Sequence, residues 1–126
     1  MENDLLAPES ADQIATLCRT AIGDSLRSVT YFTRDDFEQL YLRGDLEQDA
    51  DLMDFIGHEW QDFKNTQNAY SGSELGEYKF TVRAFENGYL VRVATDREGV
   101  FATTDSLTLQ QYEEVATAIS EILEER

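Results

Sequence analysis

The feature that most constrains the fold is a pair of alternating apolar and polar runs on either side of Asn87-Gly88. This dipeptide favours the type I′ turn of a two-residue β-hairpin, because both residues adopt a positive φ at little cost. The turn sets the register of the two strands. Residues equidistant from it are then predicted to face one another, pairing Phe85 with Leu90, Ala84 with Val91 and Arg83 with Arg92.

Alternation divides the side chains of this hairpin between two faces, because successive residues of a strand point to opposite sides of the sheet. The apolar face is predicted to carry Tyr78, Phe80, Val82, Ala84, Tyr89, Val91 and Val93. The reverse face is predicted to carry Lys79, Thr81, Arg83, Phe85, Leu90 and Arg92. The hairpin therefore predicts a sheet with one apolar side against helices and basic side chains on the other side.

The remaining elements are predicted from apolar periodicity and from capping signals. Thr108 and Gln111 form a capping box at the start of a final helix, and Ser10 and Gln13 form one at the start of a first helix. The other predicted elements are a strand over 28–33, a short helix over 33–44, a long helix over about 45–68 and a third meander strand over 100–104.

The predicted order is α-β-α-α-β-β-β-α. It defines an α+β fold with an antiparallel sheet, a three-strand meander plus one further strand, packed by helices. Residues 1–9 are expected to form a frayed leader, and residues 10–126 a single α+β domain, since 126 residues suffice for one hydrophobic core.

The charge of the chain is strongly acidic, with 26 Asp and Glu against 10 Lys and Arg, a net charge of -16. Only Lys64 and Lys79 are lysines. Such self-repulsion opposes folding at low ionic strength, whereas molar salt shortens the screening length to about 3 Å. The combination predicts a protein of a halophilic archaeon, and the alternative is an acidic protein of an ordinary cytoplasm.

Several functional classes are disfavoured by the composition. A single cysteine, Cys18, excludes an intrachain disulfide, and its place on the apolar stripe of the first helix predicts a buried thiol. The chain has no basic start followed by an apolar run and no apolar stretch of membrane-spanning length, so a cytoplasmic protein without a membrane partner is expected. Nucleic-acid binding is disfavoured because phosphate contacts need a basic surface.

One polar column stands on the long helix, where Asp54, His58 and Asp62 are spaced four residues apart. This column could hold a weakly bound divalent metal or relay a proton, and the alternative is a solvated polar face. The sequence has no nucleophile–base pair, phosphate loop or cofactor motif. We therefore predict no catalytic residue, no cofactor and no resident metal.

The basic face of the hairpin is the candidate interaction surface. Two arginines directly opposite each other destabilise a sheet unless an anion lies near them. Arginine readily forms bidentate pairs with carboxylates, so the anion could come from a packed helix or a second subunit. The alternative is docking of an acidic protein or anionic ligand around an apolar centre. The predicted surface residues are Lys79, Arg83, Phe85, Leu90 and Arg92.

Two resemblances bear on the fold. The element order is similar to that of roadblock and profilin-like domains, which place helices around an antiparallel sheet, although the second strand of the roadblock amino-terminal hairpin is not predicted here. The segments YFTRDDFEQLYLRGDLEQDADL and FIGHEW resemble small acidic domain families of unknown function in halophilic archaea, from about Val29 to the carboxyl terminus. That resemblance implies provenance and fold, and no activity.

The sequence as a whole favours a non-enzymatic regulatory or protein-interaction module. A homodimer, or a complex with another cytoplasmic protein, is expected. The alternative is a small-molecule sensor with a pocket between the sheet and the long helix, lined by Tyr31, Trp60, Tyr70 and Tyr78.

Overall fold

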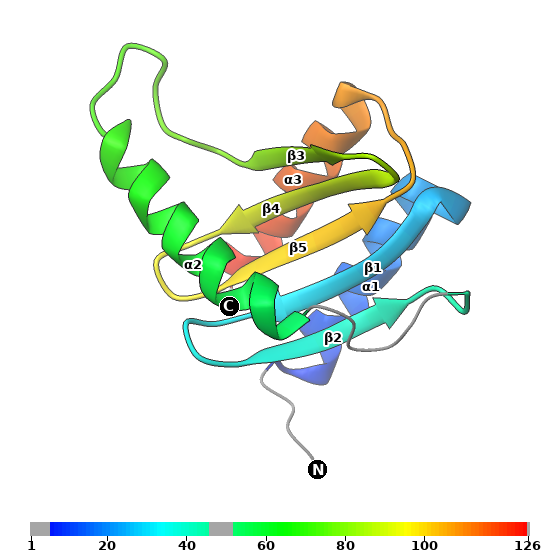
Figure 1. Ribbon diagram of the computed structural model, residues 1–126. Coiled ribbons are helices and arrows are strands. Elements are labelled where there is room, and N and C mark those ends of the chain that lie inside the picture. Colours follow the sequence, from blue (N-terminus) through cyan, green and yellow to red (C-terminus); the bar gives the residue numbers. More distant parts are fainter. Residues whose placement is uncertain (1–5, 46–51, 126) are drawn as a thin grey trace.

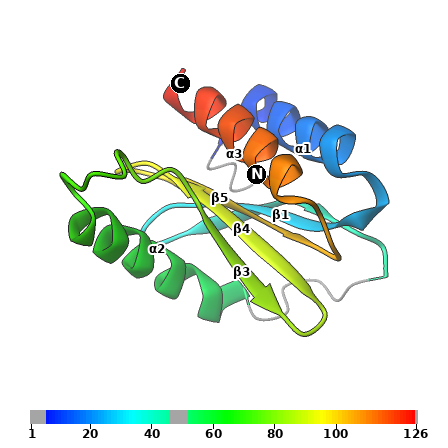
Figure 2. The same cartoon turned by 90° about the horizontal axis from the view of Figure 1, so that it is seen from above.

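The computed structural model describes residues 6–45 and 52–125, with only the backbone described for residues 52–55. A five-stranded antiparallel sheet in the order β2-β1-β5-β4-β3 forms its centre. Helices α1 and α3 cover one face of this sheet and α2 crosses the other (Figures 1 and 2). The elements are α1 (Pro8–Ile22), β1 (Leu26–Phe32), β2 (Phe37–Leu42), α2 (Leu52–Ala69), β3 (Thr81–Phe85), β4 (Gly88–Ala94), β5 (Gly99–Thr104) and α3 (Leu109–Glu124).

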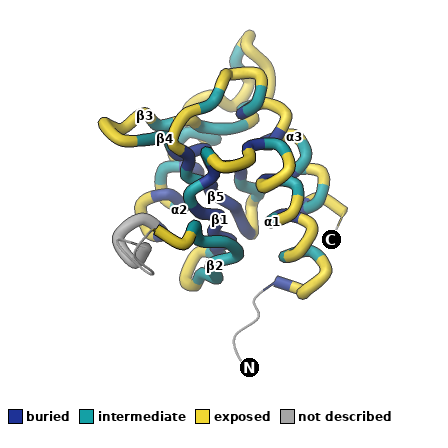
Figure 3. Tube along the Cα trace, turned by 90° about the vertical axis from the view of Figure 1, so that its right-hand side faces the viewer, coloured by how far each residue is buried: buried dark blue, intermediate teal, exposed yellow. Residues whose placement is uncertain are grey.

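The face under α1 and α3, here the α1/α3 face, holds the larger hydrophobic cluster. Figure 3 shows the buried residues gathered between the central strands and the helices. The apolar stripes of both helices enter this cluster, with α1 contributing Ile14, Cys18 and Ile22. Its other fully or nearly buried members are Leu6, Leu26, Val29, Tyr31, Val91, Val93, Val100, Ala102, Tyr112, Val115, Ala116, Ile119 and Leu123.

The face under α2, here the α2 face, holds a smaller apolar cluster. Phe32, Leu90 and Phe101 from the sheet pack with Ile56 of α2, and Phe37 and Trp60 lie at its margin. The rings of Phe32 and Phe101 are tilted against each other with centroids 5.8 Å apart. The two faces of the sheet therefore differ in how much apolar surface they bury.

The α+β class, the antiparallel sheet and its covering helices confirm the predicted fold. The Thr108 hydroxyl accepts a hydrogen bond from the Gln111 backbone N–H, and the Gln111 side chain accepts one from the Thr108 backbone N–H. The predicted capping box is thus present at α3. Cys18 is buried as predicted, and burial raises the pKa of its thiol to about 12.

The short helix predicted over 33–44 is wrong, because this segment forms strand β2. A bulge explains the error, since Gln39 and Tyr41 pair with consecutive residues of β1 and leave Leu40 without a partner. The bulge interrupts the two-residue period and produces an apolar spacing typical of a helix. The order is therefore α-β-β-α-β-β-β-α, and β1 with β2 supplies the amino-terminal hairpin that the sequence did not predict.

The predicted hairpin register is wrong by two residues. The two-residue loop is Glu86-Asn87, so that Phe85 pairs with Gly88 and Arg83 with Leu90. Gly88 instead lies in β4, where an added Cβ would stand 2.5 Å from the Thr104 carbonyl oxygen of β5. A shift of two residues preserves the alternation, so the predicted division of side chains between the two faces holds within β3 and β4. It is wrong before β3, where Tyr78 contacts Phe63 and Arg92 on the α2 face and Lys79 lies beside α3.

The predicted start of the first helix is also wrong, because α1 begins at Pro8 and Ala7 is its N-cap residue, with no side-chain cap. Proline fits the first turn of a helix, where its missing N–H has no partner to lose. Leu6 is fully buried in the larger cluster. Residues 1–5 of the predicted leader, and residues 46–51 of the predicted long helix, lie outside the described residues.

Candidate interaction surface

Four charged side chains meet between α2 and the β3–β4 hairpin, and we call them the ionic cluster: Glu59, Asp62, Arg83 and Arg92. Glu59 and Asp62 are three residues apart on α2, which places them on one side of the helix. Arg92 Nη1 lies 2.8 Å from Glu59 Oε1 and 2.8 Å from Asp62 Oδ2. Arg83 approaches the same carboxylates at 3.0 and 2.8 Å. The two positive and two negative charges of the cluster balance.

Arg92 is the most enclosed member of this cluster, with a side chain that is 0% exposed. Its Nη2 donates hydrogen bonds to the hydroxyls of Tyr78 and Thr81, at 2.6 and 2.9 Å. Its Nη1 also donates to the main-chain carbonyl of Glu59 at 3.0 Å. Burial opposes the charge of Arg92, yet these hydrogen bonds and the neighbouring carboxylates raise its pKa. The guanidinium therefore stays charged beneath α2.

The cluster matches one of the two interpretations of the basic hairpin face, in which a packed helix supplies the neutralising acids. Arg92 and Leu90 are buried under α2, and Arg83 is partly covered. Lys79 is exposed and Phe85 is 57% exposed. The five predicted surface residues are thus not one continuous surface, because α2 covers its centre.

Phe85 remains accessible at the end of the hairpin that α2 leaves open. It lines a depression of about 370 Å³ together with buried Leu90, and the wall also includes Arg27, Gly88 and Thr103. Phe85 in this depression and Lys79 outside it are the predicted surface residues that stay exposed.

The polar column predicted on the long helix is divided by the fold. The Asp62 carboxylate binds both arginines of the ionic cluster, whereas His58 is exposed to solvent. Asp54 lies in α2 among the residues whose side chains are not described. In the described part of the chain, no three His, Cys, Asp or Glu side chains gather as a metal would require. The metal or proton-relay interpretation stays a prediction.

Of the four aromatic residues proposed to line a sensor pocket, only Trp60 and Tyr78 come together, each against the ring of Phe63. Tyr31 is buried in the cluster of the α1/α3 face and donates a hydrogen bond to Glu98 at 2.7 Å. Trp60 lies on the opposite side of the sheet, and Tyr70 is 55% exposed. The Tyr78 hydroxyl accepts a hydrogen bond from Arg92 of the ionic cluster. The predicted sensor pocket between sheet and long helix is therefore wrong in its residues.

Two further arginines, Arg27 and Arg43, form ion pairs within the chain, at the end of the sheet where β1 begins and β5 ends. Arg43 Nη1 lies 2.7 Å from Asp105, and Arg27 Nη1 lies 2.9 Å from the same carboxylate. Hydrogen bonds from Arg43 and Arg27 hold the pKa of Asp105 below its ordinary value. Both arginines thus join loops at this end of the sheet, and a carboxylate of the same chain balances their positive charge.

The two edges of the sheet differ in how they are protected from a further strand. At the β2 edge the ladder is broken by the bulge, and Glu38 accepts a hydrogen bond from the Leu6 backbone N–H at 3.3 Å.

At the β3 edge the pairing with β4 is regular over all five residues, without proline. Val82 is 37% exposed there and Phe85 is 57% exposed. The β3 edge is thus the unprotected one. The sequence could not reveal it, because it gives no strand order.

The sequence matches the DUF7522 family, a domain of unknown function, over residues 12–124. The chain belongs to this family. No curated protein matches it. Within the described parts of the chain, no helix combines the length and apolar character needed to cross a bilayer.

Solved structures of MglB share the fold, which confirms the predicted likeness to roadblock domains. A structure described as MglB with tetrameric arrangement has a TM-score of 0.67 at 16% identity, covering 99% of this chain and 98% of that chain. The gliding protein MglB from Thermus thermophilus has a TM-score of 0.68 at 16% identity, covering 97% and 96%. Myxococcus xanthus MglB has a TM-score of 0.66 at 13% identity, covering 96% and 92%.

Proposed function

We propose that this chain is a non-enzymatic protein-interaction module that forms a homodimer by adding the β3 edge of one copy to that of another. The observation that carries the proposal is the regular, unprotected β3 edge with Val82 and Phe85 exposed beside it. An open strand edge presents unpaired backbone N–H and C=O groups that a further strand can satisfy.

A two-fold axis across this edge gives a closed dimer, because each copy contributes the same surface to the contact. Antiparallel pairing of β3 with its copy would place Val82 and Ala84 of each chain near those of the other, on the α1/α3 face. Both side chains are exposed in the single chain. Their burial would add apolar contact to the backbone hydrogen bonds. The fold is also that of an MglB described in a tetrameric arrangement, which supports self-association.

The charge of the chain favours a salty cytoplasm as the setting for this association. Two copies with a formal charge of -16 each repel one another over the range of the screening length. That length falls from about 10 Å at 0.1 M salt to about 3 Å at 1 M. We therefore expect the dimer to form in molar salt and to dissociate as the salt is diluted.

The double substitution V82E/A84E tests the edge directly. It puts carboxylates where the dimer would bury apolar side chains, and burying an unpaired charge is costly even in molar salt. It alters two side chains that are already exposed in the single chain. We expect a dimer for the natural chain in molar potassium chloride and at least roughly tenfold weaker association for the variant, about 1.4 kcal/mol. Size-exclusion chromatography with light scattering over a dilution series gives the dissociation constant.

The matched control is L109E, because Leu109 is 72% exposed at the start of α3 and is not part of the β3 strand. This substitution should leave the dissociation constant unchanged, and circular dichroism should show the same helical content in all chains. A natural chain that is monomeric at high concentration in molar salt, or a dimer that tolerates V82E/A84E, would refute the proposed edge.

A further inference from the structure

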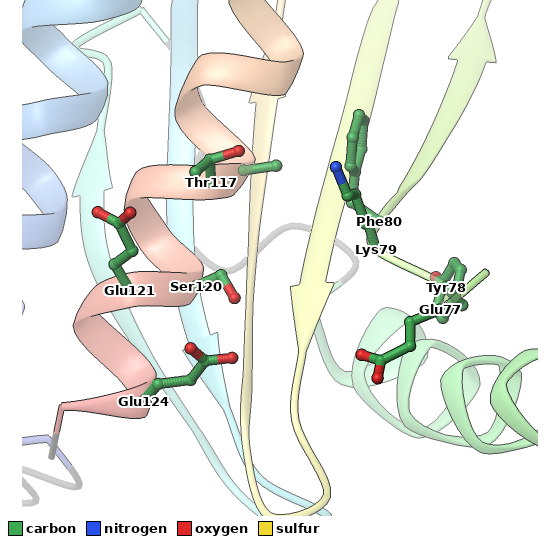
Figure 4. Close-up of a pocket in the computed structure, with 9 residues that line it drawn as sticks. Glu77, Tyr78, Lys79, Phe80, Thr117, Ser120, Glu121 and Glu124 are labelled. Carbon is green, nitrogen blue, oxygen red and sulfur yellow. The ribbon is translucent and has the colours of Figure 1, made fainter.

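A groove lies between the carboxyl-terminal half of α3 and the segment that leads into β3 (Figure 4). Its volume is about 330 Å³. One wall is the segment 77–80 that leads into β3, and the other is the face of α3 that carries Thr117, Ser120 and Glu124. Phe80 and Ala116, which pack with the large apolar cluster, form its floor. The groove thus has an apolar base between polar walls.

The charge at the rim of this groove is negative from both sides. In Figure 4 the carboxylates of Glu77 and Glu124 extend into the gap from opposite walls, and Glu121 stands one turn before Glu124. None of these three carboxylates forms a salt bridge within the described residues. Lys79 is the one cation among the residues that line the groove. The rim therefore presents more negative than positive charge.

The position of these acids on α3 conflicts with the helix dipole. The last turn of a helix carries partial negative charge, so cations are favoured there and anions are not. The last turn of α3 holds no basic residue, and Glu121 and Glu124 stand in it. Acids in this turn are therefore less favourable than acids elsewhere on the surface of the chain. A cation supplied from outside would relieve the conflict.

The wall opposite α3 can offer backbone groups as well as charge. Residues 78–80 carry no strand assignment, and the ladder of β3 with β4 starts only at Thr81. An extended chain lying in the groove could therefore reach both main-chain groups of this segment and the carboxylates of the rim. Addition of an extended peptide beside an exposed backbone segment is a recurring mode of peptide recognition.

We propose that this groove binds an extended segment of a partner protein that carries lysine or arginine side chains. The inference rests on the proposed interaction role of the chain, yet it uses side chains facing α3 and not the backbone edge of residues 81–85. Lysine and arginine heads would pair with Glu77 and Glu124 while their aliphatic stems lie on Phe80 and Ala116. The partner is thus basic, the reverse of the acidic partner that the sequence suggested for the opposite face of the hairpin.

The test uses a fluorescent peptide of alternating arginine and serine, and a second peptide with glutamate in place of arginine. Binding is measured by anisotropy on the full chain at the lowest salt that retains its circular dichroism spectrum. Amide shifts of the isotope-labelled chain locate the peptide. We expect the arginine peptide alone to bind and to shift residues 77–80 and 116–124. The substitutions E77Q/E124Q should weaken binding roughly tenfold, as expected for two partly exposed ion pairs.

The control E113Q/E114Q removes the same charge from exposed positions of α3 that do not line the groove. It should leave the affinity within about twofold, since unspecific attraction depends only on net charge. An equal loss in both variants, shifts that map elsewhere, or no binding at all would overturn the proposal. The dimer edge is tested separately, because V82E/A84E changes association and not the groove carboxylates, whereas E77Q/E124Q should leave the dimer intact.

Discussion

The two faces of the sheet are held by different forces. On the α1/α3 face, two amphipathic helices bury a large cluster of aliphatic and aromatic side chains. On the α2 face, one helix is attached through a cluster of four buried apolar residues, through buried Phe63 and through the ionic cluster. Apolar burial stabilises in proportion to area and is largely indifferent to direction. Ion pairs need fixed geometry and carry a desolvation cost.

This difference suggests a division of roles between the faces. The α1/α3 face should supply most of the free energy of folding. The ionic cluster should add little net stability but fix where α2 lies over β3 and β4, because Glu59 and Asp62 each bind both arginines. Removing one partner of such a cluster is costly, whereas removing a whole charge pair need not be.

The largest effect is expected from R92M, which breaks the cluster from within. Methionine keeps the unbranched stem but removes the charge that faces Glu59, whose side chain is 4% exposed. Leaving a buried carboxylate with one partner fewer should lower the free energy of unfolding by about 3–5 kcal/mol. Chemical denaturation in molar salt, followed by circular dichroism, measures the loss.

The companion variant E59M/R92M removes both of the buried charges and leaves the more exposed pair of Asp62 and Arg83. It should recover most of the stability lost in R92M, because no unpaired charge remains beneath α2. If the double variant is as unstable as the single one, the cluster contributes stability and not only placement. The division of roles between the two faces would then be wrong.

A somewhat smaller effect is expected for I119A, which tests the apolar face. Ile119 is 1% exposed and sits inside the larger cluster, so its truncation leaves a cavity that neighbours cannot readily fill. The expected loss is about 3 kcal/mol, against about 2 kcal/mol for I56A on the α2 face. Ile56 belongs to a cluster of four residues under a single helix. That helix can move towards the sheet and partly fill the cavity, so the loss is smaller. Equal losses in parallel denaturation curves would show that the two faces are packed alike.

The elements predicted correctly from the sequence are those with a local signal. The capping box of Thr108 and Gln111 placed the start of α3, and alternation placed β3, β4 and β5 with the right side chains on each face. The acids that neutralise Arg83 and Arg92 were foreseen as a class, since arginine on a sheet face needs an anion nearby. That much follows from short-range chemistry alone.

What could not be predicted depends on contacts distant in sequence. The bulge at Leu40 arises from pairing with β1, so β2 carried the spacing of a helix. The hairpin register departs from the turn preference of Asn87-Gly88, and Gly88 instead lies where β4 approaches the Thr104 carbonyl of β5, a contact distant in sequence. The unprotected edge and the groove beside α3 both follow from the strand order, which a single sequence does not contain.

The smallest expected effect concerns the pH dependence of the α2 face. Burial disfavours the charged form of Asp62, but the hydrogen bond from Arg92 and the charges of Arg92 and Arg83 outweigh it and lower its pKa. A carboxylate with a lowered pKa in the folded protein stabilises the fold above its unfolded pKa of about 3.9. That contribution is lost as the pH falls through the folded value.

The variant D62N should therefore be less stable than the natural chain at neutral pH, by about 1 kcal/mol, since Asp62 is partly exposed and screened by salt. The difference in free energy of unfolding between the two chains should shrink when the denaturation is repeated at successively lower pH. At low pH the carboxylate of the natural chain becomes neutral as well. D12N, at an exposed position of α1, controls for net charge and should track the natural chain throughout. A gap between D62N and the natural chain that stays constant down to low pH would mean that Asp62 acts through packing, and the ionic account of the α2 face would lose its support.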